Sequence, residues 1–292
     1  MEDFRLIIGE ATDAGQVREQ NEDAVYHDAV SDASNDELTL IALADGMGGY
    51  QRGEVASEMA IDALRQRFAA ADTDDLVLML KQAFRHANER IFENGSADGE
   101  HNMMGTTLVA GVIRGTNLAL GNVGDSRAYL VRAIALNQIT TDHSLVAEQV
   151  AMGAMTQEEA RGSQHRNIIT RALGHRQKVD VDIFELTLLP GDRLLLSSDG
   201  LHDHIGDDEV VELMTTLPPA EAAKRMVTRA IEEGSTDNVS ALCLWAAPVS
   251  VLEAQDAVTP EASSRVAAMV AVLVIIGLAI VIAIVGYILI AT

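Results

Sequence analysis

The chain has 292 residues, with 44 acidic and 21 basic side chains and a formal net charge of −23. Such an acidic balance argues against nucleic acid as a partner, because phosphate backbones select basic surfaces. Hydrophobic residues make up 48% of the chain and aromatic residues 3%. We therefore expect a sizeable core built mainly from aliphatic side chains.

The first half of the chain contains short apolar runs that predict strands, followed by two longer segments that predict helices. The strand-like runs lie at 4–10, 22–28, 38–44 and, as a meander with a turn at Arg114-Gly115, 106–133. Apolar residues recur at helical spacing over 53–70 and 74–93. Asp74 and Asp75 lie near the start of the second helix, where the helix dipole favours acidic side chains.

The second half begins with a helical pattern over 144–162 that is broken at Gly153. The later elements are strands at 180–189 and 192–198 with a Pro190-Gly191 turn, helices at 207–215 and 220–233, and a last strand at 238–245. This order lacks the regular alternation of a parallel sheet. It predicts an α+β fold, a four-layer β-sandwich of two antiparallel sheets flanked by paired helices.

The C-terminal region has a different composition. Val266 to Ile290 is a run of 25 residues without a charge, which is long enough to span a bilayer. We predict a domain at 1–246, a juxtamembrane linker at 247–264 and a transmembrane helix at 265–290. The N-terminus has no signal-peptide pattern, and Arg265 flanks the helix. We expect a single-pass protein of the inner membrane with its domain in the cytoplasm; a buried core helix is the alternative.

Six acidic residues lie in short, turn-like contexts across the chain: Glu22, Asp23, Asp45, Asp125, Asp199 and Asp237. Each context alone is typical of an ordinary turn. Asp45 and Asp199, however, follow strongly apolar runs, and a carboxylate at the end of a buried strand needs a compensating charge. Clustered carboxylates also repel one another. The pattern predicts one shared site for hard divalent cations such as Mg²⁺, Mn²⁺ or Ca²⁺.

Eight motifs occur in a characteristic order: DAGQVREQNED (13–23), ADGMGG (44–49), GTT (105–107), GNVGDSRAY (121–129), TDHS (141–144), NIITRALG (167–174), LLLSSDGL (194–201) and TDNVSAL (236–242). Together they resemble the PP2C (PPM) family of metal-dependent serine/threonine protein phosphatases in its compact bacterial form, over residues 4–245. The resemblance implies hydrolysis of phosphoserine and phosphothreonine in proteins by a metal-activated water. It also implies phosphoproteins and a cognate Ser/Thr kinase as partners.

The resemblance implies a role for each matching metal ligand. Asp45 would bridge two Mn²⁺ or Mg²⁺ ions, with the carbonyl of Gly46 on the second ion. Asp199 and Asp237 would complete the protein ligands of the first ion. Asp125, with Asp199, would hold a third, weaker ion.

Three further residues match the family's site. Glu22 and Asp23 match an acidic pair that binds the second ion directly or holds its waters, and both readings stay open. Arg18 would bind the substrate phosphate, for which a guanidinium offers paired donors.

One position departs from many eukaryotic relatives, which have histidine after ADG where this chain has Met47. Protonation of the leaving group is therefore unassigned; His143 is one candidate, and a structural histidine is the other reading. Residues 144–175 match a flap beside the site. Its basic side chains meet either a phosphopeptide or solvent: His165, Arg166 and Arg171.

Other functional classes make different demands on the sequence. A non-catalytic PP2C-like module would show degenerate ligands, and a calcium-dependent adhesion domain would need clustered D-x-D-x-D loops. The single cysteine, Cys243, lies in the apolar run SALCLW. We expect a buried strand residue there, with a catalytic thiol as the alternative.

Overall fold

The computed structural model describes residues 3–31, 37–48, 52–70, 73–97 and 104–254. It divides into two compact units, one of Arg5–Ala246 and one that joins Met1–Phe4 to Ala247–Thr292. Within the described ranges no helix is both long enough and apolar enough to cross a bilayer. The predicted transmembrane helix at 265–290, and the linker beyond residue 254, lie outside those ranges.

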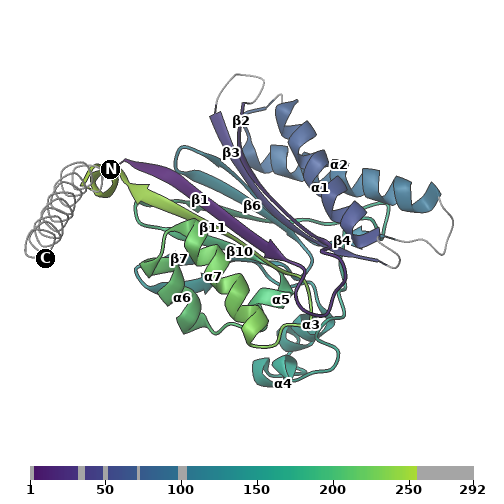
Figure 1. The fold of residues 1–292 in the computed structure, drawn as a ribbon. Helices are drawn as coiled ribbons and strands as arrows, with labels where there is room; N and C mark the ends of the chain where they lie inside the picture. The colour runs from purple at the N-terminus through teal and green to yellow at the C-terminus, as the bar shows by residue number, and fades with distance from the viewer. Residues whose placement is uncertain (1–2, 32–36, 49–51, 71–72, 98–103, 255–292) are drawn as a thin grey trace, which may run out of the picture. The chain divides into compact units, whose positions relative to one another are not determined.

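Two sheets form the centre of the larger unit (Figure 1). The first has the strand order β1 (Phe4–Asp13), β11 (Val239–Pro248), β10 (Arg193–Ser197), β7 (Arg127–Arg132) and β8 (Ala135–Gln138). The second has the order β2 (Asp23–Ser31), β3 (Glu37–Met47), β5 (Leu108–Arg114), β6 (Asn117–Val123) and β9 (Asp182–Thr187), with β4 (Gly105–Thr106) on β3. Within the second sheet every neighbouring pair is antiparallel, as the sequence predicts.

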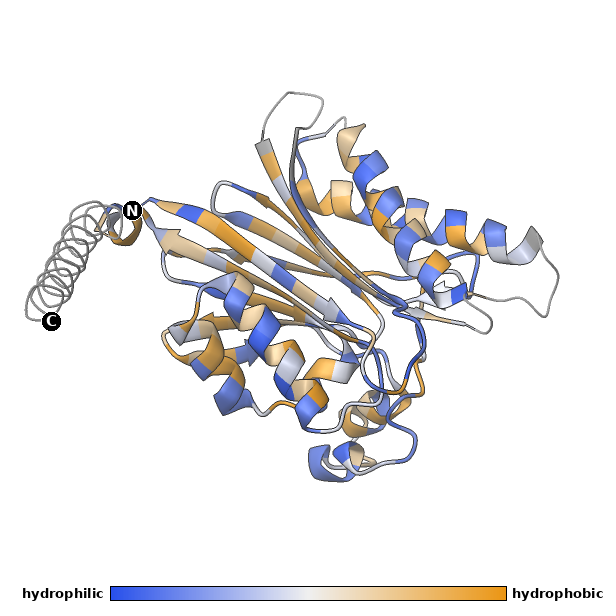
Figure 2. Ribbon diagram, in the orientation of Figure 1, coloured by the Kyte–Doolittle hydropathy of each residue, from blue (hydrophilic) through white to orange (hydrophobic). Residues whose placement is uncertain are grey.

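A pair of helices covers the outer face of each sheet. On the second sheet these are α1 (Arg52–Ala69) and α2 (Leu76–Ala97), which lie side by side in Figure 1. Their buried residues form one core with β3, β5 and β6. On the first sheet, α6 (Asp207–Thr216) and α7 (Pro219–Glu232) form a second core with β7, β10 and β11. Figure 2 shows apolar residues along the strands and mixed polar and apolar residues around these helices.

The space between the sheets is filled by the residues that alternate with those facing the helices. Ile41 and Leu43 of β3, and Leu194 and Leu196 of β10, are fully buried but belong to neither helix-facing core. Because successive strand residues point to opposite faces, these side chains face the opposing sheet. The predicted layer order of helices, sheet, sheet and helices is confirmed.

The predicted break in the helical segment at 144–162 is confirmed, because Gly153 adopts a φ of 72° between two short helices, α3 (Leu145–Ala151) and α4 (Gln157–Arg161). Two other elements differ from the prediction. The one-turn helix α5 (Asp199–His202) and the exposed strand β8 were not predicted. β8 lacks the apolar alternation that marks a half-buried strand, and a single helical turn is too short for a periodic signal.

Candidate active site

Asp23 and Asp45 are brought together by the pairing of β2 with β3. They lie directly opposite each other in the register, so their side chains share one face. β3 does not end at Asp45, as the sequence suggested, because Gly46 and Met47 continue it by pairing with β4. The hydroxyl of Thr107 accepts a 2.9 Å hydrogen bond from the amide of Asp45.

Asp199 and Asp125 approach from the ends of two other strands. Asp199 is the first residue of α5 and follows β10 directly. Asp125 follows β6 after Gly124, whose φ is 111°. A Cβ at Gly124 would lie 2.6 Å from the side chain of Thr107. This position therefore requires glycine both for its backbone conformation and for space.

The N-terminal loop that carries Arg18 and Glu22 is held by Asn238. The side-chain amide of Asn238 donates to the carbonyls of Ala14, at 3.1 Å, and Gln20, at 2.9 Å. Its side-chain oxygen accepts a 2.8 Å hydrogen bond from the amide of Glu22. The sequence pattern did not indicate this role, although Asn238 follows Asp237 within the TDN motif.

The structure pairs two residues for which the resemblance implies separate partners. Arg18 donates a 2.7 Å hydrogen bond to Asp237, and their side chains are 50% and 32% exposed. The predicted phosphate-binding residue and a predicted metal ligand thus neutralise each other in the protein without ligands. Substrate binding through Arg18 requires this exposed pair to open, which costs little because exposed ion pairs contribute about 0–1 kcal/mol.

Glu22 lies in a tight junction between β3 and α1. The amide of Gly46 donates to the carbonyl of Glu22 at 3.0 Å. A Cβ at Gly53 would lie 2.6 Å from the carboxyl carbon of Glu22. Burial raises the pKa of Glu22, while Arg18 and the backbone amide of Gly53 act in the opposite direction. Gly53 is a second residue that the sequence analysis missed; its only signal is its place in a glycine-rich stretch before α1.

The closeness of these carboxylates and their burial raise their pKa values. Burial raises the pKa of Asp23 to about 6, with Asp237 adding to the rise. Burial also raises the pKa of Asp45 well above its ordinary value, followed by repulsion from Asp23, Asp199 and Asp125. The pKa of Asp199 is raised well above its ordinary value by burial and then by Asp125 and Asp237. The pKa of Asp125 rises to about 7 for the same first reason.

These residues fit a divalent cation. Both carboxylate oxygens of Asp23 are buried without a hydrogen-bond partner, although the hydroxyls of Ser198 and Ser240 are near enough to lower its pKa. Such a buried group is costly unless a cation compensates it. The donors are all hard oxygens, which suit Mn²⁺ or Mg²⁺. Among the described residues, no three acidic, histidine or cysteine side chains form a ready-made metal cluster. The ion pair of Asp237 with Arg18 turns one expected ligand toward the guanidinium.

His143 is a structural residue, as one of the two sequence readings held. Its Nδ1 accepts a 2.9 Å hydrogen bond from the amide of Gly124, and its Nε2 lies 3.2 Å from Asp182. Because Nδ1 accepts, Nε2 carries the proton and donates to Asp182. Both ring nitrogens are engaged, so His143 does not supply a proton to a leaving group.

The predicted flap lies beside this acidic site. A cavity of about 440 Å³ is lined by Asp125 and Asp199 and also by residues of α3, α4 and the segment after them. Arg166 lines this cavity and lies 3.3 Å from Asp203. Arg171 instead forms a 2.7 Å ion pair with Asp182. Of the three basic flap residues, Arg166 is therefore the one directed toward the site.

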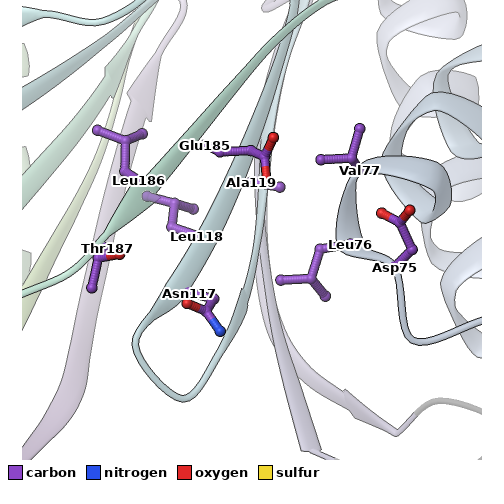
Figure 3. A pocket seen from close by; sticks show the side chains of 9 residues that line it. All are labelled: Asp75, Leu76, Val77, Asn117, Leu118, Ala119, Glu185, Leu186 and Thr187. Carbon is purple, nitrogen blue, oxygen red and sulfur yellow. The ribbon is translucent and has the colours of Figure 1, made fainter.

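A second hollow, of about 390 Å³, contains none of the predicted site residues (Figure 3). It lies where the start of α2 meets β6 and β9, and both Asp75 and Glu185 contribute to its lining. Its lining contains two acidic residues, Asp75 and Glu185, and not a cluster of buried carboxylates. The candidate active site is therefore the acidic end of the two sheets and not this hollow.

Known proteins share this architecture and sequence. The family model described as protein phosphatase 2C matches residues 15–242. The serine/threonine phosphatase stp of Listeria monocytogenes is 36% identical over 238 residues, covering 79% of this chain and 92% of that protein. The S. agalactiae serine/threonine phosphatase structure has a TM-score of 0.76 at 33% identity, covering 82% of this chain and 99% of that one.

The structure of the PstP catalytic domain, solved in complex with two manganese ions, has a TM-score of 0.72 at 37% identity. It covers 83% of this chain and all of that domain. The resemblance carried by the eight motifs is confirmed by these matches, which extend over most of the chain. The chain belongs to the protein phosphatase 2C family.

Proposed function

We propose that this chain hydrolyses phosphoserine and phosphothreonine in proteins with two Mn²⁺ or Mg²⁺ ions and a third, weaker one. The serine/threonine phosphatase activity follows from membership of the family and from the named relatives. The observation that carries the metal proposal is the group of buried carboxylates with raised pKa values and the unpartnered oxygens of Asp23. The two manganese ions of the PstP domain support the same assignment.

Each predicted residue then has a task. Asp45, the carbonyl of Gly46, Asp199 and Asp237 would hold the two ions, and Asp125 with Asp199 would hold the third. Glu22 and Asp23 would bind the second ion or its waters. Bound ions would acidify water and stabilise charge on the phosphate.

The chain's own groups orient the substrate. Arg18, half-exposed beside Asp237, would bind the phosphate oxygens once the ion pair opens. Asn238 would keep Arg18 and Glu22 in register with β11 through its three hydrogen bonds to the loop. The cavity beside the flap would accommodate residues of the phosphoprotein next to the reacting phosphate.

Phosphate release from a phosphothreonine peptide with Mn²⁺ tests this function. We expect Asp199→Asn to lose roughly 100-fold or more in kcat, because it removes a charged group from the reacting centre. Asp180→Asn is the matched control, since Asp180 is exposed and outside the site. Equal activity of the native protein and Asp199→Asn would rule out the proposed metal mechanism. Absence of Mn²⁺ binding by calorimetry would favour the alternative of a non-catalytic module.

The C-terminal prediction is also part of our proposal. An uncharged run of 25 residues from Val266 to Ile290 supports a single membrane-spanning helix at 265–290. The phosphatase domain (1–246) and linker (247–264) would then lie on the cytoplasmic side of the inner membrane. Carbonate extraction compares the full chain with a chain ending at residue 264. We expect only the full chain to stay in the membrane pellet, and its recovery in the soluble fraction would contradict the proposal.

A membrane-bound phosphatase would act on targets that a Ser/Thr kinase phosphorylates at the same membrane. This partner is proposed from the family's usual opposition to such kinases. Comparison of phosphoproteins between a wild-type strain and a deletion strain would identify the targets. We expect phosphothreonine or phosphoserine sites on membrane-associated proteins to accumulate in the deletion strain. An unchanged set of phosphosites would contradict the proposal.

A further inference from the structure

Neither Met47, at the position where many eukaryotic relatives have histidine, nor the candidate His143 can donate a proton or a hydrogen bond to the leaving oxygen. Met47 has no polar hydrogen, and both ring nitrogens of His143 are engaged. In the hydrolysis proposed above, the serine or threonine oxygen gains negative charge as its bond to phosphorus breaks. A hydrogen-bond donor placed where this charge develops would lower the barrier.

A different imidazole lies beside Met47. In the antiparallel pairing of β3 with β4, Met47 is directly opposite Gly105. A Cβ built on Gly105 would lie 2.6 Å from Nε2 and 2.7 Å from Cδ2 of His175. The ring of His175 therefore occupies the space that a side chain at position 105 would fill.

This location puts His175 on the same face as the acidic site. Directly opposite residues of an antiparallel pair point to the same face, with Cβ atoms about 4.5–5.5 Å apart. Asp45 precedes Met47 by two residues, so its side chain points to that face too, roughly 7 Å further along the strand. His175 therefore lies over the strand next to Met47, on the face of the sheet that the side chain of Asp45 shares.

The sequence explains how the ring reaches this position. Leu173 forms an isolated bridge with Thr106 of β4, which brings the end of the flap segment alongside the strand. Gly174 then adopts a φ of 85°, and its amide donates to Asn88 at 3.0 Å. This anchored turn directs His175 back over Gly105. The absence of a side chain at Gly105 is what gives the ring its space.

We propose that His175 is a catalytic residue that donates a hydrogen bond to the departing serine or threonine oxygen. In this step the oxygen of the attacking water bonds to phosphorus, and the bond from phosphorus to the seryl or threonyl oxygen breaks. The departing oxygen keeps the electron pair and takes its proton from solvent, while the attacking water loses one proton to solvent. The ring holds its own proton throughout.

The state of the ring suits this role. Burial lowers the pKa of His175 below its ordinary value, and the neighbouring Arg176 lowers it further. A neutral imidazole keeps one N–H group and donates it without changing its charge, as the neutral electrophilic histidine of triosephosphate isomerase does. This burial is partial, since the residue as a whole counts as exposed, and a substrate has access to it.

The test uses two substrates and two substitutions in the full chain. On a phosphothreonine peptide we expect His175→Ala to lose roughly 100-fold in kcat. On p-nitrophenyl phosphate the loss should shrink to a few-fold, because nitrophenolate spreads its own negative charge over the ring. His175→Gln keeps an N–H donor and should recover part of the peptide activity. His86→Ala on α2 is the matched control.

Two measurements besides turnover complete the design. Mn²⁺ binding by calorimetry should be equal in the wild type and His175→Ala. Addition of inorganic phosphate with diamagnetic Mg²⁺ should shift the ring ¹⁵N signal that His175→Ala lacks. A wild type inactive on both substrates would overturn the proposed function itself. If the wild type is active, an equal loss on both substrates, a loss below about 3-fold on the peptide, or an unshifted ring signal would overturn the role of His175.

Discussion

Replacing Asp125 by asparagine is expected to stabilise the metal-free protein near pH 8. Burial raises the pKa of Asp125 from 3.8 to about 7, with Asp142 as the next cause. A rise of about 3 pKa units corresponds to about 4 kcal/mol between the fully protonated and fully ionised states. An asparagine avoids this cost but still leaves a buried amide, which costs about 1–3 kcal/mol. The net gain is on the order of 2 kcal/mol.

The sign of the pH dependence follows from the direction of the shift. A carboxyl whose pKa is higher in the folded than in the unfolded protein gives stability that is complete below about pH 4. That stability is lost as the pH rises through about 7. The gain in the free energy of unfolding of Asp125→Asn over the wild type should therefore fall by more than half between about pH 8 and about pH 5. Mn²⁺ should remove it as well, because the native carboxylate gains a cation.

Urea unfolding in the presence of a chelator measures the free energy of unfolding at each pH. In thermal unfolding under the same conditions, a gain of about 2 kcal/mol should appear as a rise of about 4–8 °C in Tm. Asp180→Asn, which changes an exposed carboxylate, serves as the control. The reasoning is refuted if Asp125→Asn is no more stable than the wild type near pH 8. It is also refuted if its advantage is the same at both pH values.

Three further substitutions or reactions test the site and the core. Asn238→Ala removes three hydrogen bonds to the N-terminal loop. We therefore expect the free energy of unfolding in urea to fall by about 2–4 kcal/mol and kcat to fall at least about 10-fold. Wild-type activity of this variant would show that the loop does not depend on Asn238 for its position. Gly53→Ala should weaken Mn²⁺ binding about 10-fold in calorimetry, because the new Cβ would lie 2.6 Å from Glu22. Gly162→Ala is the control, since its Cβ would meet no atom closer than 3.9 Å. Burial raises the pKa of the Cys243 thiol to about 12, so iodoacetamide should label Cys243 only in urea; rapid labelling of the native protein would reopen the catalytic-thiol reading.

Much of the architecture is predictable because its signals are local. The buried strands at 38–44 and 192–198 are short apolar runs bounded by turn residues, and both are found as strands. The turn at Pro190-Gly191 is confirmed by the φ of 93° at Gly191. β8 and α5 escaped prediction because an exposed four-residue strand and a single turn carry no periodic pattern.

The acidic residues of the site could be predicted from the sequence, but the residues that hold them in position could not. A buried carboxylate after an apolar run is conspicuous in a sequence, so Asp45 and Asp199 could be identified from their context. Asn238 and Gly53 act through geometry: one bonds three backbone groups at distant positions, and the other leaves space for Glu22. Neither function depends on local periodicity, so only the folded chain reveals them.

The position of a side chain in the folded chain also decides which histidine can serve the leaving group. The sequence pointed to His143 and not to His175. His143 lies in the TDHS motif, whose polar residues suggest chemistry, yet its ring binds Gly124 and Asp182. His175 is separated from Met47 by 128 positions in the sequence, and only the β3–β4 register and the turn at Gly174 bring it alongside. A polar side chain can thus be placed beside one strand of the site by a segment that is distant in the sequence. Here the space for the His175 ring exists because position 105 of the neighbouring strand is glycine.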